Sequence, residues 1–201
     1  IAAGDFILFG ISSDCGGSTY TWPAGFTELY KVELNYDGQT VALAYKIANG
    51  TESGSFSATG ACNTEAVVLM TYSGVVASAP VTSKTDNLVV TPSPYPLSGS
   101  ITTTATGAQV VYVAFADPNN ITSGRTFAPP VGYSTIAAQT DNWSPIFVAH
   151  AGTGLAGSTG ALSATMTDPG GSALTSVMIV ALNPSGTVTT VAGAGNTAAG
   201  T

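Results

Sequence analysis

Carboxylates come closest to a catalytic set in this sequence. Glycosidic bonds are cleaved by two carboxyl groups held a few ångströms apart, and four glutamates are available for such a pair: Glu28, Glu33, Glu52 and Glu65. Nothing in their spacing brings any two together, and most of them fall beside expected turns. We therefore expect surface carboxylates and no glycosidase.

The remaining catalytic candidates are equally isolated. His150 is the only histidine, and it lies on an alternating segment in the opposite phase to Phe147 and Ala149. The chain has no Gly-x-Ser-x-Gly motif, and its many serines and threonines have no positioned base. The sequence thus predicts that His150 is structural or faces solvent, and that the protein is not an enzyme.

Oxygen ligands for calcium gather in two loops, "ADPNN" and "TDNW". Their candidate residues are Asp117, Asn119, Asn120, Asp141 and Asn142. The spacing does not follow that of an EF-hand, and ordinary turns explain the same residues. The sequence therefore predicts no cofactor, with calcium as the alternative.

Two short segments share an unusual arrangement of proline, glycine and an aromatic residue, "TWPAGF" and "APPVGY". Proline fixes one backbone angle, and the glycine two residues later suits a left-handed position, so each segment predicts a tight turn. The turn then delivers an aromatic plug into the next strand. The residues concerned are Pro23, Gly25 and Phe26 in the first segment, and Pro130, Gly132 and Tyr133 in the second.

Other loop aromatics offer an alternative, functional interpretation of these regions. Tyr20, Trp22 and Trp143 could stack on sugar rings, because flat aromatic side chains in loops present an apolar face with a polar edge.

Cys15 and Cys62 both lie in glycine-rich turn segments, far apart in the sequence. This placement permits a disulfide between two loops but does not require it. The alternative is two half-buried thiols that act as small apolar residues. No histidine or third cysteine stands at ligand spacing, so zinc is not expected.

Charge excludes further classes of partner. The 201 residues carry a net charge of -7, with only four lysines and arginines, too few for the basic surface that nucleic acid requires. No apolar run approaches the roughly 18 residues that cross a bilayer. We expect neither nucleic acid nor membrane as a partner.

Short apolar runs separated by Gly, Pro and Asn turns predict an all-β chain. "DFILFGIS" and "QVVYVAFAD" are typical of central strands, and "TVALAYKIANG" alternates as a strand of a sandwich does. No segment repeats its apolar residues at helical spacing. These features favour a jelly-roll-like antiparallel β-sandwich.

The same order of strands, turns and a Ser-Ala-Thr segment occurs twice, which indicates a tandem duplication. We expect one sandwich over residues 1–186, with related halves at about 4–75 and 107–186. The proline-rich segment 76–106 would cross between them. Residues 187–201 would form a Gly/Ala/Thr-rich tail, disordered alone or ordered by a neighbouring chain.

The first half in its full order resembles the β-sandwich virion proteins of tailed bacteriophages. The residues that carry the resemblance are Gly4, Asp5, Pro23 to Phe26, Tyr45 to Ala48, Glu52, and Tyr72 to Val75. The second half departs from this pattern at the lysine, where His150 stands, and at the acidic residue. The pattern consists of strands and turns and contains no catalytic signature.

The resemblance implies a structural virion component on the particle surface, such as a capsid decoration or cement protein, or a domain of a tail or fibre. Its partners would be neighbouring virion subunits such as the major capsid protein. A symmetric homo-oligomer, for example a trimer, is the expected working state. The alternative function is an adhesin domain of a tail fibre or bacterial surface protein that binds carbohydrate or a receptor.

Overall fold

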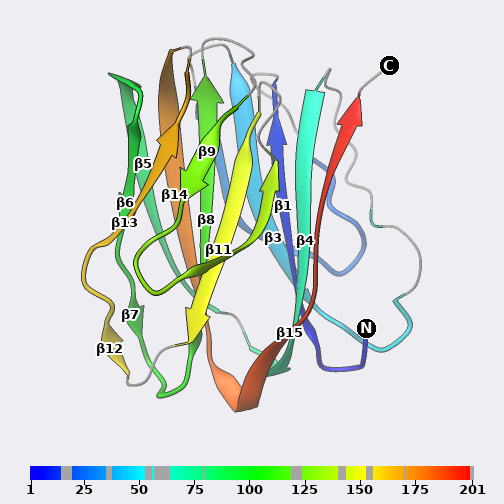
Figure 1. The fold of residues 1–201 in the computed structure, drawn as a ribbon. Helices are drawn as coiled ribbons and strands as arrows, with labels where there is room; N and C mark the ends of the chain where they lie inside the picture. Colours follow the sequence, from blue (N-terminus) through cyan, green and yellow to red (C-terminus); the bar gives the residue numbers. More distant parts are fainter. Residues whose placement is uncertain are drawn as a thin grey trace.

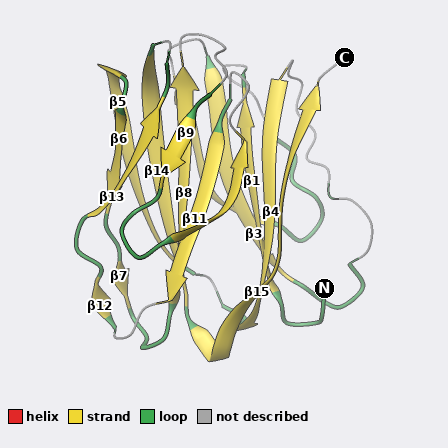
Figure 2. Ribbon diagram, viewed as in Figure 1, coloured by secondary structure: helices red, strands yellow, loops and turns green. Residues whose placement is uncertain are grey.

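The computed structural model describes residues 1–14, 20–34, 38–52, 56, 64–78, 80–118, 124–139, 144–152, 156–169 and 171–199. Within these ranges the backbone alone is described for 64–65, 81–92, 95–96, 118, 172 and 191–199. The strands form layers that run roughly side by side (Figure 1), and the described chain consists of strands and loops (Figure 2).

The first sheet has five strands in the order β15-β4-β1-β3-β2. Its strands are β1 (Phe6–Ser13), β2 (Thr27–Leu34), β3 (Gln39–Ile47), β4 (Thr64–Val75) and β15 (Pro184–Ala199). Every residue of β1 is buried, because this apolar strand lies at the centre of the sheet with both faces covered.

The second sheet also has five strands, in the order β10-β11-β8-β14-β5. Its strands are β5 (Val81–Pro92), β8 (Gln109–Pro118), β10 (Ser134–Gln139), β11 (Ile146–Gly152) and β14 (Ser172–Leu182). The apolar run of β8 takes the central place here, as β1 does in the first sheet.

A third layer of short strands covers the outer face of the second sheet. Its three-stranded sheet has the order β6-β13-β9, and β7 pairs with β12 beside it. The strands are β6 (Tyr95–Gly99), β7 (Thr102–Thr103), β9 (Thr126–Ala128), β12 (Gly157–Ser158) and β13 (Leu162–Thr167).

The two large sheets have the same strand order along the chain. In the first sheet, β4, β1, β3 and β2 lie side by side, and β14, β8, β11 and β10 repeat this order in the second. The fifth strand of each sheet comes from elsewhere: β5 follows β4 in the sequence but pairs with β14, and β15 follows β14 but pairs with β4. Each sheet therefore takes its fifth strand from the segment of the chain that comes directly after the other sheet's four strands.

The principal core lies between the two large sheets. It contains Phe6, Leu8 and Met70 from the first sheet, together with Phe115 and Val148 from the second, all of them fully buried. The hydroxyl of Tyr30 on β2 lies 2.6 Å from Oγ of Ser176 on β14. This buried hydrogen bond links the two sheets through the apolar layer.

A second core lies between the second sheet and the third layer. Tyr112 and Phe147 of the large sheet pack there with Leu97, Ala164 and Met166 of the short strands. The hydroxyl of Tyr112 donates to the carbonyl of Leu97 at 2.6 Å, so the buried phenol is satisfied.

The all-β sandwich predicted from the sequence is confirmed. Because β1 to β4 stay in one sheet, the strand order does not confirm the jelly-roll connectivity, and the tandem origin of the halves stays a prediction. The segment 76–106 carries β5, β6 and β7 and so contributes to two layers.

The predicted tail differs from the structure. Residues 187–199 belong to β15 and pair with β4 of the same chain. The free edge of β4 offers backbone hydrogen-bond partners, and a segment without charge and with a single proline at its start can take them. Residues 200 and 201 lie outside the described residues.

A tight contact between the sheets gives the first testable prediction. A Cβ placed on Gly10 of β1 would lie 2.9 Å from Cγ2 of Val68 and 3.0 Å from Cδ1 of Ile146. We expect Gly10→Ala to lower the free energy of unfolding by about 1–3 kcal/mol, since the packed core must shift. Urea denaturation measures the change.

Gly186→Ala is the matched control, because a Cβ at Gly186 meets nothing within 4 Å. We expect it to change the free energy of unfolding by less than about 0.5 kcal/mol. Equal losses in the two variants would contradict the close packing of β1 on the second sheet.

Candidate functional site

Both Pro-x-Gly-aromatic segments form the same hydrogen-bonded turn. The amide of Phe26 donates to the carbonyl of Pro23 at 3.1 Å, and the amide of Tyr133 donates to the carbonyl of Pro130 at 2.9 Å. Gly25 and Gly132 have φ values of 85° and 84°, a left-handed conformation that glycine adopts without steric cost. The geometry is that of the turn the sequence predicts.

Each turn delivers its aromatic residue onto the central strand of its sheet. The ring of Phe26 meets Phe9 of β1 edge-on, with centroids 5.8 Å apart, and the ring of Tyr133 meets Tyr112 of β8 edge-on at 6.5 Å. Phe26 also contacts Phe56 at 5.4 Å. Such pairs of rings fix the entry of β2 and β10 into their sheets.

The strands after the two turns also match. The pairing of β2 with β3 shifts between Glu28 and Tyr30, and the pairing of β10 with β11 shifts between Thr135 and Ala137. Both irregularities start at the second residue after the turn aromatic. The two turns therefore occupy equivalent places in the two sheets.

The register aligns residues of the two halves one by one. Phe9 pairs with Ala44, and its equivalent Tyr112 pairs with Ala149. One residue further along each partner strand, Tyr45 corresponds to His150. The sequence comparison, which placed His150 opposite the lysine, is thus off by one residue, because the loop before β11 differs in length from that before β3.

The first turn is covered by an ion pair. Nζ of Lys46 on β3 lies 2.9 Å from Oε1 of Glu52, and the lysine stem passes within 3.2 Å of the place where a Cβ of Gly25 would be. The same carboxylate accepts hydrogen bonds from the amides of Asn49 and Gly50 at 2.9 to 3.1 Å. These backbone bonds and Lys46 lower the pKa of Glu52 from 4.5 to about 2.

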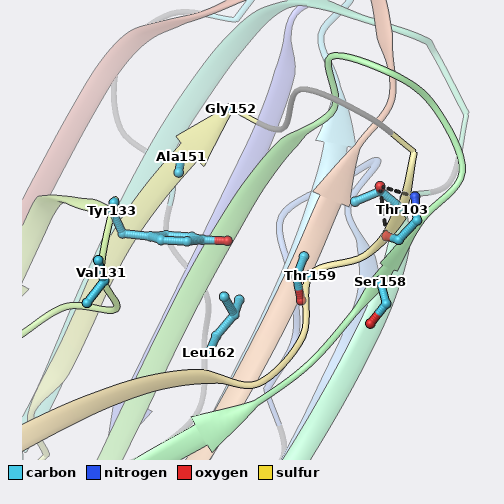
Figure 3. A pocket seen from close by; sticks show the side chains of 10 residues that line it. Thr103, Val131, Tyr133, Ala151, Gly152, Ser158, Thr159 and Leu162 are labelled. Carbon is cyan, nitrogen blue, oxygen red and sulfur yellow. Dashed lines mark hydrogen bonds between the residues drawn. The ribbon is translucent and has the colours of Figure 1, made fainter.

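The second turn has no such cover. Ala151 stands at the position equivalent to Lys46, and nothing lies within 4 Å of a Cβ placed on Gly132. A hollow of about 380 Å³ opens between this turn, the end of β11 and the β7–β12 pair. Figure 3 shows the ring of Tyr133 extending across it, with Thr103, Ser158 and Thr159 on the far wall.

Tyr20 and Trp22 lie together at the outer surface of the first half. Their ring centroids are 6.1 Å apart, and the indole of Trp22 packs edge-on against Phe9 at 5.7 Å. The indole Nε1 donates to Oε2 of Glu28 at 2.9 Å, and Nζ of Lys31 lies 5.6 Å from the centroid of Tyr20. This orients both rings at a half-buried surface, whereas Trp143 lies outside the described residues.

His150 lies on β11 beside Tyr72, a buried residue of the principal core. Its Nδ1 is 3.1 Å from Oγ1 of Thr190 on β15, and its ring stands 6.2 Å from that of Tyr72. Desolvation by burial lowers the pKa of this imidazole. Through these contacts His150 packs between β11 of the second sheet and strands β4 and β15 of the first.

The glutamates have separate surroundings. Glu28 bonds Trp22, Glu52 bonds Lys46, and Glu33 is exposed. The side chain of Glu65 is not described. Among the three glutamates whose side chains are described, no two share a site.

The described part of the chain contains no group of three or more His, Cys, Asp or Glu residues that could hold a metal ion. Of the calcium candidates, Asp117 is buried, while Asn119, Asn120, Asp141 and Asn142 lie outside the described residues. Cys15 and Cys62 lie outside them as well, so their predicted bridge stays a prediction.

Two features were not anticipated from the sequence. Arg125, before β9, and Asp168, after β13, form a buried ion pair with Nε 2.7 Å from Oδ2, and the amide of Asp168 donates to Oγ of Ser93. The hollow beside Tyr133 was missed because its walls come from four separate segments. A basic and an acidic residue in a chain with few charges were the available signal for the ion pair.

Among the described residues, no helix has the length and apolar content needed to cross a membrane. Comparisons with family models, with curated proteins and with solved structures find no match to this chain.

The ion pair beside the first turn gives a prediction of pH dependence. Because the pKa of Glu52 is lowered to about 2 in the folded protein, its contribution to stability is present above pH 4.5 and is lost as pH falls toward 2. We expect Glu52→Gln to remove this part of the acid dependence and to lower stability at neutral pH. Thermal unfolding measured across this pH range detects both effects.

Glu33→Gln is the control, since Glu33 is an exposed glutamate on β2. It should leave the acid limb of the stability profile close to that of the wild type. An unchanged profile in Glu52→Gln would contradict the assigned role of Glu52.

Proposed function

We propose that this protein is a non-enzymatic building block on the exterior of a virus particle, which packs against neighbouring subunits through one side of its sandwich. The observation that carries the proposal is the distribution of charge over the edge strands. Edge strands expose unpaired backbone groups, and charged residues on them are a common protection against association.

One side of the sandwich is protected in this way. β2, "TELYKVEL", contains Glu28, Lys31 and Glu33, and β5, "VTSKTDNLVVTP", contains Lys84 and Asp86. These strands are the edges of the first and second sheets, respectively, and β2 lies close to β14, the neighbour of β5.

The other side carries no charged residue on its edge strands. β10, "STIAAQ", and β15, "PSGTVTTVAGAGNTAA", lie close to each other and end the two sheets there. We call this the uncharged side. Its small side chains allow another subunit to approach the backbone, where hydrogen bonds and a broad contact area can hold it.

The contacts of positively charged side chains within the chain support the same function. Lys46 and Arg125 are held in ion pairs, and Lys31 lies over the ring of Tyr20. With a net charge of -7, little positive charge is left to attract nucleic acid or other polyanions. A surface rich in hydroxyl groups and small residues suits contact with neighbouring protein subunits.

The resemblance of the first half to virion proteins of tailed bacteriophages supports a place on the particle surface, as a capsid decoration or cement protein. Its partners would be copies of itself, for example in a trimer, and a shell protein such as the major capsid protein. We further infer that the two halves arose by tandem duplication, which the equivalent turns, strand shifts and strand orders support.

A second candidate function is carbohydrate binding by a surface adhesin. The pairing of Tyr20 with Trp22, and the hydrogen bond that orients the indole, favour it. Flat rings fixed in this way can stack on a sugar.

The uncharged side can be tested by adding charge to it. Thr135 on β10 and Thr187 on β15 are exposed, and we expect Thr135→Lys combined with Thr187→Lys to weaken self-association by roughly tenfold or more through like-charge repulsion across the contact. Sedimentation velocity over a range of concentrations measures the association constant.

Thr27→Lys on the charged side is the matched control, since Thr27 is an exposed threonine of β2. It should leave self-association close to that of the wild type. A wild-type chain that stays monomeric at millimolar concentration, or equal weakening by the control, would contradict the proposal.

The second candidate has its own test. If Tyr20 and Trp22 bind sugar, Trp22→Ala should abolish glycan binding on an array while self-association is retained, because the indole lies at the outer surface of β1 and away from the uncharged side. The absence of any glycan signal from the wild-type protein would remove this function.

A further inference from the structure

The hollow beside Tyr133 is an open surface depression on which the proposed assembly function does not rest. Its volume is about 380 Å³, near the lower end of the range for small-molecule sites. The larger side chains among the residues that line it are Thr103, Val131, Tyr133, Ser158, Thr159 and Leu162. In Figure 3 the Tyr133 ring enters from one side, above Leu162, and its hydroxyl points toward the side of Thr103 and Thr159.

The hollow exists because the second half lacks a side chain that the first half has. Lys46 lies across Gly25 and reaches Glu52, while Ala151 occupies the equivalent place on β11 and leaves Gly132 uncovered. The two turns share their hydrogen bond and glycine conformation, but only the second faces the β7–β12 pair, which supplies the far wall of the hollow. The short side chain of Ala151 therefore leaves open the space between the turn and the β7–β12 pair.

None of the described residues that line the hollow is charged, and most of their polar groups are held by hydrogen bonds within the chain. Oγ1 of Thr103 bonds both the carbonyl and the amide of Gly157 at 3.2 Å. Oγ1 of Thr159 donates to the carbonyl of Gly160 at 3.0 Å and accepts from the amide of Ile101. Each of these two hydroxyl groups donates one hydrogen bond and accepts one, so one lone pair of each oxygen remains to accept a hydrogen bond from a ligand.

Two hydroxyls can act as donors to a ligand. Oγ of Ser158 accepts from the amide of Gly160 at 3.1 Å, so its proton is available. The phenol of Tyr133 is protonated at neutral pH, and burial raises its pKa further, to about 12. The hollow thus combines donors and acceptors with the apolar surfaces of Tyr133, Val131 and Leu162.

We propose that this hollow binds one ring of a neutral sugar, with an apolar face of the ring against Tyr133 and Leu162 and its hydroxyls toward Ser158 and the two threonines. The neutral hydroxyl groups and apolar surfaces of the described lining match an uncharged ligand better than an ion. Val131, whose side chain is fully exposed at the tip of the turn, would border the bound ring.

A neighbouring hollow extends the site. It has a volume of about 400 Å³, is lined by Ser98, Ser100 and Ala161 among others, and shares Ser158 with the first. A second ring of an oligosaccharide could lie there without leaving the surface. The same surface could therefore accommodate a neutral glycan longer than one unit.

Protein-detected NMR titration tests the proposal. The probes are the methyl glycosides of glucose, galactose, mannose and N-acetylglucosamine, with glycerol as a small polyol. We expect at least one glycoside to shift the amides of Gly132, Tyr133, Gly152 and Gly157. Ala151→Leu, which fills the hollow from β11, should weaken this binding by roughly tenfold or more, because the added side chain occupies the space of the ring.

Ala24→Leu is the matched control, because it makes the same change at the tip of the first turn, where Lys46 covers the neighbouring glycine. It should leave binding unchanged. Tyr133→Phe retains the ring that packs on Tyr112 and removes only the hydroxyl, so it should bind the glycoside roughly two- to tenfold more weakly. This second variant keeps the proposal testable if Ala151→Leu does not fold.

Three results would overturn the proposal: no glycoside shifts these amides, glycerol binds as tightly as the glycosides, or both Ala151→Leu and Tyr133→Phe bind as the wild type does. Loss of binding in Trp22→Ala with full binding in both hollow variants would assign the sugar to the first half instead. None of these results bears on the self-association of the uncharged side, so the two proposals can fail separately.

Discussion

The apolar inner faces of the two five-stranded sheets are removed from water only by packing against each other, and the rest of the structure depends on this contact. Phe6, Leu8 and Met70 on one sheet need Phe115 and Val148 on the other. The chain reinforces this dependence through its connections, since β5 completes the sheet that β14 belongs to and β15 completes the sheet that β4 belongs to. Neither five-stranded sheet is complete on its own, because each takes its fifth strand from the segment that follows the last strand of the other sheet's set of four.

Within this shared frame the two halves have taken different local solutions. The same turn and the same pair of aromatic rings occur in both, yet Lys46 and Glu52 close the surface over Gly25 while Ala151 leaves it open over Gly132. The sandwich is also uneven across its width, with charges on β2 and β5 and none on β10 and β15. Two sheets with the same strand order thus present one closed turn, one open turn, one protected side and one uncharged side.

The sequence predicts the parts of the fold that depend on local patterns. The apolar runs of β1 and β8 mark the central strands, and the Pro-x-Gly pairs mark the turns, because in each case neighbouring residues decide the conformation. The full length of β15 was not predicted, since its Gly and Ala residues have little strand preference and the open edge of β4 decides their pairing. The hollow was missed for a similar reason: Thr103, Tyr133 and Ser158 meet only through the tertiary fold.

The central claim is that this protein covers the outside of a virus particle, and immunogold electron microscopy tests it most directly. An antibody raised against this chain would be applied to intact particles and to cells from the source. The account predicts label on the outer surface of the particles, spaced regularly over heads or along tails. Label confined to cell surfaces in cultures without particles, or intact particles without any label, would contradict it.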